Sequence, residues 1–270
     1  MRTLLRTLSI TWALYAAAIR GEMQYRLNFL LLVLLGVFYQ GSGFAFIWIV
    51  LYQFDTIAGW TFGEIALLYS LRLLAHAVWV VPFHQVQFLD TTVREGRFDR
   101  YLVRPLNPLL QVMTTRFQMN VIGDVAAAAL LFTIAAHLVD LNLSPLTGAY
   151  LILVVLGGAL IEGAAVVAVS SLSFRFVQTW AANHLIDNFF LLFGSYPTTI
   201  FGGVLNWALT WVVPIAFIAY IPASVFLEKT GELHMSAIVA FGTPVMGAVW
   251  FLLAYWVWHR QARRYHSVGN

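Results

Sequence analysis

Residues 147–171 read TGAYLILVVLGGALIEGAAVVAVSS, and Glu162 is the only charged side chain in this stretch. A helix needs about 20 mainly apolar residues to cross the hydrocarbon core of a bilayer, so the stretch is long enough to cross once. Other apolar stretches of this kind predict spans at residues 29–52, 64–83, 117–139, 185–222 and 236–258. The sequence therefore predicts an all-α membrane protein with six transmembrane helices.

The composition agrees with a chain that lies mostly within lipid. The 270 residues are 61% hydrophobic and 10% charged, with a mean hydropathy of +0.80, which leaves too few polar residues to cover a soluble domain. No polar stretch is long enough to fold separately, so residues 1–270 are predicted to form a single transmembrane permease domain. Because the chain has no cysteine, disulfides, thiolate nucleophiles and cysteine-ligated metal centres are excluded.

The basic residues predict the orientation. With the N-terminus in the cytoplasm, thirteen of the fifteen Lys and Arg residues fall on the inner side: Arg2, Arg6, Arg20, Arg26, Arg94, Arg97, Arg100, Arg104, Arg116, Arg175, Arg260, Arg263 and Arg264. Only Lys229 lies outside, and Arg72 lies within a span. This bias predicts that both termini are cytoplasmic. Because the arginines flank apolar spans, the net charge of +3 indicates topology and lipid contact rather than nucleic-acid binding.

The apolar stretch 185–222 is too long for one simple crossing. Two full crossings would put the C-terminal arginines outside, so we expect one crossing followed by an outer re-entrant element before span six. Pro197, Gly202, Pro214 and Pro222 interrupt the stretch. Broken helices persist at membrane depth only where protein or water satisfies the freed backbone groups, and they often line a pathway. A kinked helix without a transport role fits the pattern as well.

The N-terminal residues 1–26 form a separate amphipathic segment. One helical face gathers its large apolar side chains, Leu4, Leu5, Leu8, Trp12 and Tyr15, with arginines around them. This spacing predicts an interfacial helix lying in the membrane plane, which can also contact a cytoplasmic partner.

The most distinctive polar run lies in the inner loop between spans two and three. Residues 91–108 read TTVREGRFDRYLVRPLNP, in which Gly96 is a natural helix stop and Pro105 ends the next short segment. Between them, Phe98, Tyr101 and Leu102 share one helical face, and arginines occupy another. The pattern predicts a short amphipathic element with an exposed aromatic edge. Docking into a protein groove and binding of anionic lipid fit this periodicity equally.

Residues 94–108 resemble the signature of bacterial type-2 ATP-binding-cassette exporter permeases, in the six-span subfamily of the multidrug and lipid efflux type. Further stretches agree in the right order: Tyr196-Pro197, residues 213–223 (VPIAFIAYIPA) and residues 264–269 (RYHSVG). The tail agrees less closely, because Gln261-Ala262 stands where the family pattern has a glycine-containing pair.

The resemblance implies a half-transporter that pairs with a second, identical or paralogous permease and with two cytoplasmic ATPase subunits, which bind ATP and Mg. The loop 85–112 would carry the ATPase-coupling residues Arg94, Glu95, Gly96, Phe98, Asp99, Arg100, Tyr101, Arg104 and Pro105. The outer region 196–235 would contribute the pathway or gate residues Tyr196, Pro197, Pro214, Phe217, Tyr220 and Pro222. The membrane would be the bacterial inner (cytoplasmic) membrane.

The residues independently indicate that ATP hydrolysis belongs to another chain. The only lysine is Lys229, and no G-x-x-x-x-G-K-[ST] occurs, so a phosphate-cradling P-loop cannot be built. No Gly-x-Ser-x-Gly or His-Glu-x-x-His motif is present either. We therefore expect no enzymatic activity and no bound cofactor on this chain.

Ionisable residues within spans are candidates for function by default, and here they are Arg72, His76, Asp124 and Glu162. Arg72 and His76 share a helical face, and Arg72 can reach Glu162 as an interhelical ion pair. Packing or subunit contact and a role in substrate recognition or gating both fit. A proton-coupled secondary transporter, with Asp124 and Glu162 as its proton relay, is an alternative function, and a non-transporting membrane scaffold is another.

Span four also has a small-residue face. Gly157, Gly158 and Gly163 lie among alanines, which predicts close helix packing, within the chain or at a seam between two subunits.

Overall fold

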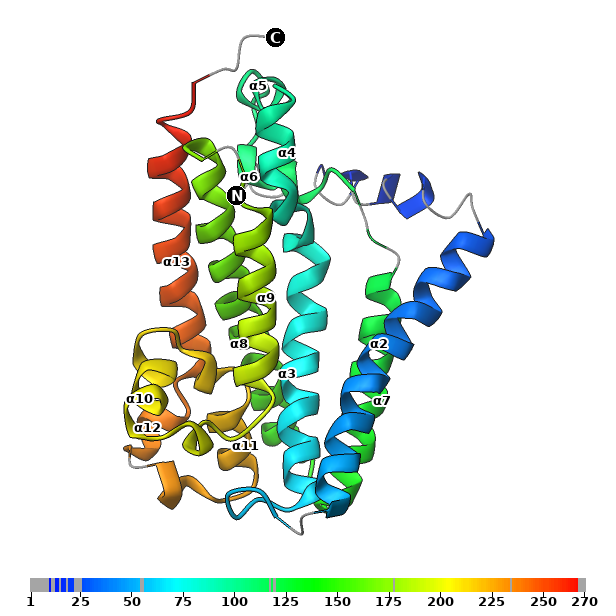
Figure 1. Ribbon diagram of the computed structural model, residues 1–270, viewed down its shortest axis with the longest axis vertical. Coiled ribbons are helices and arrows are strands. Elements are labelled where there is room, and N and C mark those ends of the chain that lie inside the picture. Colours follow the sequence, from blue (N-terminus) through cyan, green and yellow to red (C-terminus); the bar gives the residue numbers. More distant parts are fainter. Residues whose placement is uncertain are drawn as a thin grey trace.

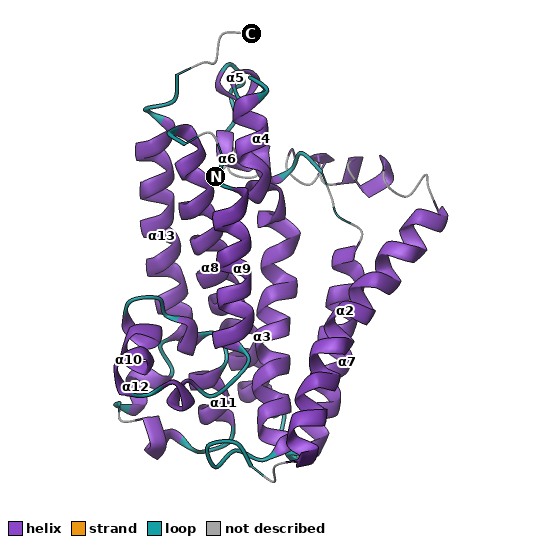
Figure 2. Ribbon diagram, viewed as in Figure 1, coloured by secondary structure: helices purple, strands orange, loops and turns teal. Residues whose placement is uncertain are grey.

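A computed structural model describes residues 26–53, 56–116, 118, 120–176, 178–233 and 235–266, together with residues 10, 13–14, 16–17 and 19–21. Its long helices are α2 (Arg26–Gln53), α3 (Phe62–Phe83), α7 (Asn120–Leu138), α8 (Pro145–Ser171), α9 (Trp180–Gly194) and α13 (Thr243–Ala262). Shorter elements are η1 (His84–Phe88), α4 (Leu89–Arg94), α5 (Asp99–Leu102), α6 (Pro108–Met113), η2 (Leu172–Phe174), η3 (Thr198–Phe201), α10 (Gly203–Trp211), η4 (Ile215–Phe217), α11 (Tyr220–Phe226), η5 (Thr230–Leu233) and α12 (Ala237–Ala240). No strand occurs in this described part, so the all-α prediction is confirmed (Figure 2).

The described helices are those of a multi-pass membrane protein. Four are long and apolar enough to cross a bilayer: Leu27–Ile49, Phe62–Arg94, Asn120–Leu138 and Pro145–Phe174. A fifth crossing is present if the bent pair Gly203–Trp211 and Ile215–Phe226 counts as one span. Helix α9 has only 15 residues, about 22 Å of helix. The hydropathy of α13 is lowered by its Trp and Tyr residues and by its basic last turn.

The long helices form an upright bundle in which α8 packs against α3, α9 and α13 (Figure 1). Helix α7 packs against α3 on one side and α2 on the other. Glycines allow the closest approaches: a Cβ on Gly157 would lie 2.7 Å from the Thr243 carbonyl oxygen of α13. A Cβ on Gly163 would lie 2.7 Å from the Phe83 ring. The small-residue face of α8 thus packs within the chain at these positions.

The two ends of the bundle differ (Figure 1). One end carries α4, α5, α6 and the C-terminal end of α13, and it holds the arginines of the inner loop and of residues 260–264. The opposite end carries α10, α11 and α12, which belong to the segment between α9 and α13. The loop 85–112 and the region 196–235 therefore lie at opposite ends of the bundle.

Some predicted boundaries differ from those of the structure or lie outside the description. Helix α3 ends at Phe83, as predicted for span two, but helical turns continue through η1 and α4 to Arg94, so the first part of the predicted loop is helical. The last long helix begins at Thr243 rather than residue 236, after the separate helix α12. Most of the predicted interfacial helix, including Leu4, Leu5, Leu8, Trp12 and Tyr15, and the tail residues 267–270 lie outside the described residues.

Candidate functional site

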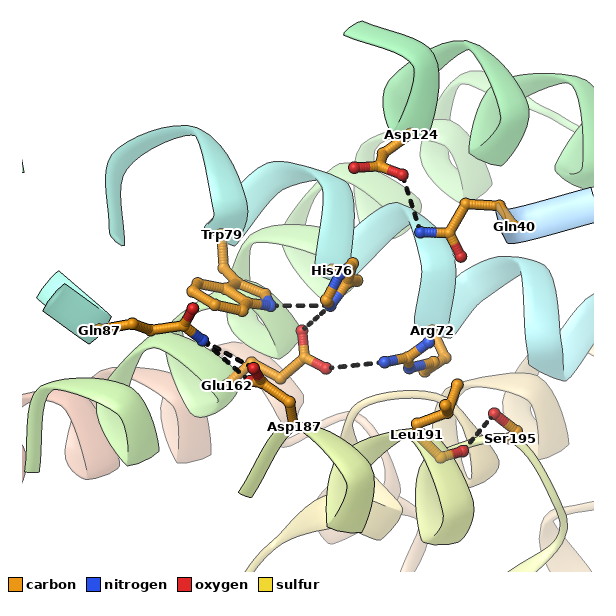
Figure 3. Close-up of polar contacts among 10 residues, drawn as sticks. All are labelled: Gln40, Arg72, His76, Trp79, Gln87, Asp124, Glu162, Asp187, Leu191 and Ser195. Atoms are coloured by element: carbon orange, nitrogen blue, oxygen red, sulfur yellow. Dashed lines mark hydrogen bonds and ion pairs between the residues drawn. The ribbon is translucent and has the colours of Figure 1, made fainter. Parts of the chain in front are cut away.

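A buried ion pair links α3 to α8 near the middle of the bundle (Figure 3). Arg72 Nη2 lies 3.6 Å from Glu162 Oε1, and the two side chains are only 4% and 3% exposed, so the pair predicted from the sequence is present. Removing ions from water costs several kcal/mol per ion, and a partner offsets that cost only with good geometry. Here the geometry is loose, because Arg72 Nε and Glu162 Oε1 have no hydrogen-bond partner among the described residues.

His76, one turn along α3 from Arg72, joins this pair. Its Nδ1 lies 3.3 Å from Glu162 Oε2, and the indole N–H of Trp79 donates to the same Nδ1 at 3.0 Å. A nitrogen that accepts from Trp79 carries no proton, whereas a protonated Nδ1 donates to Glu162. The two contacts therefore exclude each other, and whether Nδ1 carries a ring proton decides which one forms.

Two further carboxylates lie in the same layer and are bonded to amides (Figure 3). Asp124 on α7 accepts from Gln40 on α2 at 2.9 Å. Asp187 on α9 accepts from Gln87 with both oxygens, at 3.0 and 2.9 Å. The sequence analysis did not single out Asp187. The rule that selected Asp124, an ionisable residue within an apolar stretch, would have found it in residues 185–222.

These groups surround a cavity of about 510 Å³, here called the central cavity. Helices α2, α3, α7 and α9 contribute its walls, which include Gln40, Arg72, His76, Asp124, His184, Asp187, Asn188 and Leu191. Donors, acceptors and charges of both signs line it within an otherwise apolar bundle. Such a space can hold the polar part of a molecule that crosses the membrane.

The inner loop is packed onto the bundle through Phe98. The predicted exposed aromatic edge is wrong at this residue, because Phe98 is fully buried. Its ring centroid lies 4.7 Å from that of Phe174 and 5.1 Å from that of Tyr265. Burying a large aromatic ring stabilises the folded chain relative to leaving the ring in solvent. The Phe98 ring therefore anchors the loop to the bundle.

Side-chain amides and hydroxyls stiffen the rest of the loop. Gln111 donates to the backbone carbonyls of Tyr101 and Leu106, each at 2.9 Å, and the Tyr101 hydroxyl lies 3.1 Å from the Thr115 hydroxyl. Gly96 ends α4 with φ +66°, as predicted for a helix stop. The exposed residues of the loop are Phe88, Arg94, Glu95, Arg97, Arg100, Leu102, Val103, Arg104, Pro105 and Asn107, whereas Asp99 and Tyr101 are half-buried.

At the opposite end, the residues predicted as a gate are mostly packed into the core. Pro197, Pro214, Phe217, Tyr220 and Pro222 are buried and Tyr196 is half-buried. The chain bends by 69° between α10 and the η4–α11 segment. The Thr243 hydroxyl donates to the Phe217 carbonyl at 3.0 Å, so α13 supplies a partner for backbone near this break. The breaks expected from the prolines are thus present and satisfied by neighbouring protein.

Among the described residues, no group of three or more His, Asp or Glu side chains is placed to hold a metal ion. The chemistry offered by this layer is therefore that of charges, amides and rings.

A model of the ABC-2 family transporter proteins matches residues 37–269. The chain belongs to the ABC-2 transporter family. The match spans both the inner loop and the broken outer segment, so it covers every element described above except the start of α2 and the pieces before it. Comparisons with curated proteins and with solved structures found no match. Membership makes this multi-pass chain the membrane component of an ATP-binding-cassette transporter, a component that associates with an ATPase.

Proposed function

We propose that this ABC-2 chain is the permease subunit of an ATP-driven exporter and that its inner loop is the contact surface for a separate cytoplasmic ATPase, which binds ATP and Mg. The observation that carries the proposal is the construction of that loop. It is anchored by buried Phe98 while it presents Arg94, Arg100, Leu102 and Arg104 to solvent. A rigid, basic, partly apolar edge of this kind suits a protein groove.

The proposed orientation has six crossings and both termini in the cytoplasm of a bacterial cell, with the chain in the inner membrane. Helices α2, α3, α7, α8, α9 and α13 would be the crossings. Helix α9 is short, and together with the bent α10–α11 segment it would span the membrane thickness that a single straight helix spans at the other crossings. The support is the clustering of arginines at one end of the bundle, since short basic loops remain inside.

Two hydrogen bonds tie the loop side of the bundle to α9, which lines the central cavity, and they give the proposed coupling a route. The Thr179 amide donates to Asp90 at 3.3 Å, and Asn183 donates to the Gln87 carbonyl at 3.2 Å. Both contacts tie the α3–α4 run to the start of α9. A push on the loop when the ATPase subunits close would therefore move α9, which lines the cavity, between two packings.

The proposed cargo is a hydrophobic or amphiphilic molecule whose polar part enters the central cavity, and a second permease, identical or paralogous, would complete the pathway. A seam for that copy is not available on the glycine face of α8, which is already covered by α13 and α3. Helix α2 is the most open candidate, because Leu27, Leu35, Phe38 and Tyr52 on it are exposed.

Reconstitution in proteoliposomes tests the proposal. The chain is purified with its partner P-loop ATPase, and export of a fluorescent amphiphile is followed with ATP, with a proton gradient, or with neither. We expect transport only with ATP and the ATPase, and loss of it in the Arg100→Ala/Leu102→Ala variant. Transport by the chain alone on a proton gradient would instead establish the secondary transporter, with the buried Asp124 and Glu162 as its proton relay.

A further inference from the structure

A second pocket adjoins the central cavity at the loop end of the bundle. It has a volume of about 410 Å³ and lies between α2, the α3–α4 run, α6 and the start of α7. We call it the vestibule and define it by Leu32, Phe88, Arg97, Val112, Arg116 and Gln118. It shares Leu32, Gln118 and Asn120 with the central cavity, so the two spaces lie on either side of one wall.

The vestibule offers donors for an anion, and no carboxylate is among the described residues that line it. Two guanidinium groups, those of Arg97 and Arg116, line it together with the amides of Gln85, Gln118 and Asn120. Arg97 also pairs with Glu95 at 2.6 Å through one nitrogen, but a guanidinium carries five N–H donors in a fork that suits phosphate and carboxylate oxygens. A group with several acceptor oxygens and a negative charge matches this set of donors.

The remaining wall is apolar, which indicates what the anion is attached to. Leu32, Phe88 and Val112 line the same pocket, and α2 beside it exposes Leu31 and Leu35 to the surroundings of the bundle. Leu32 lies six residues into α2, about 9 Å along the helix, in the part of α2 nearest the loop end of the bundle (Figure 1). An acyl chain can follow α2 while its headgroup occupies the basic end, whereas a free phosphate would leave the apolar wall unused.

The charges of the central cavity keep such a headgroup in the vestibule. Beyond the shared wall, Arg72 is matched by Glu162, and Asp124 and Asp187 add negative charge. The sign of the lining therefore changes from basic to acidic across that wall, and an anion meets repulsion if it moves deeper.

We propose that the vestibule is a binding site for the phosphate headgroup of an anionic phospholipid of the inner leaflet. The site is distinct from the loop edge assigned to the ATPase. The proposal needs only the membrane orientation and no transport activity, so it can fail while the proposed function stands.

Native mass spectrometry of the purified chain, released from nanodiscs of phosphatidylcholine and phosphatidylglycerol, tests it. For the unaltered chain we expect preferential retention of phosphatidylglycerol. The Arg97→Gln/Arg116→Gln variant should lose that preference by roughly tenfold or more, because it removes both guanidinium partners of the headgroup phosphate. The matched control Arg263→Gln/Arg264→Gln removes two exposed charges at the same end without touching the vestibule and should keep the preference.

A steric variant and a soluble competitor separate the lipid from other sources of the anion. Leu32→Trp narrows the pocket without changing its charge and should also lower phosphatidylglycerol retention. Excess inorganic phosphate should not displace the lipid, and displacement by it would show a free-anion site instead. Equal retention by the vestibule variant and the control variant, with both variants melting like the parent chain, would overturn the proposal.

Discussion

Removing one member of the Arg72–Glu162 pair should destabilise the bundle far more than removing both. At an effective dielectric constant of about 20, opposite unit charges separated by 3.6 Å attract each other by roughly 5 kcal/mol. Breaking a buried pair from one side usually costs about 3–5 kcal/mol, because the other charge stays buried and unpaired. We therefore expect Glu162→Gln to lower the free energy of unfolding by about 3 kcal/mol.

The Arg72 variant and the double variant, which complete a double-mutant cycle with Glu162→Gln, should behave differently. Arg72→Met should cost less than Glu162→Gln, since the His76 ring still lies 3.3 Å from Glu162 Oε2 and gives this carboxylate a polar partner. The double variant Arg72→Met/Glu162→Gln should cost less than Glu162→Gln alone, because neither charge is then left buried without its partner. Arg263→Met is the matched control, because it makes the same substitution at an exposed arginine.

Intrinsic tryptophan fluorescence during heating in detergent measures these effects, since the chain has ten tryptophans. For a chain of this size, a loss of about 3 kcal/mol lowers Tm by roughly 6–12 °C. The reasoning is refuted if Glu162→Gln shifts Tm no more than Arg263→Met does, or if the single effects simply add in the double variant.

Other substitutions separate packing from partner contact. Phe98→Ala should destabilise the loop end by about 3–5 kcal/mol, seen as lower Tm and faster proteolysis of the loop; protection equal to the parent's would contradict its role as an anchor. Arg100→Ala should leave Tm unchanged but reduce stimulation of the partner ATPase, and an unchanged stimulation would count against the coupling edge. Gly157→Ala should cost about 1–3 kcal/mol, because its Cβ would lie 2.7 Å from a carbonyl oxygen of α13; a neutral Tm would show that α13 can move aside. Lys229→Met, which breaks the 2.8 Å pair with Glu64 at the outer end, should cost less than about 1 kcal/mol because the pair is partly exposed.

The sequence predicts much of this fold because the bilayer imposes a simple rule on it. Helix α8 begins within two residues of the predicted span four and ends at the predicted residue, since its apolar run is long and its start is marked by Pro145. The predicted end of span two coincides with the end of α3 at Phe83, but the polar residues after it, which look like a loop, continue as helical turns to Arg94. Hydropathy does not detect a helix that extends beyond the apolar layer.

Contacts between elements that are distant in the sequence limit how much of the site can be predicted from the sequence. The Arg72–Glu162 pair could be predicted because both residues are charged and lie in spans. Burial of Phe98 could not, because its partners Phe174 and Tyr265 follow it by many residues and no local pattern places them at the loop. Whether an aromatic residue in an amphipathic run faces solvent or the protein depends on such tertiary contacts.

Site-specific photo-cross-linking in cells tests the central claim, that a separate ATPase acts on the inner loop, most directly. A benzophenone amino acid replaces the exposed Leu102 at the loop edge, and Lys229 at the opposite end of the bundle serves as the control position. The account predicts that the probe at residue 102 forms an adduct with a P-loop ATPase, identified by mass spectrometry, and that the probe at residue 229 does not. An ATPase adduct at residue 229, or a loop that cross-links to no ATPase while the complex is intact and active, would contradict it.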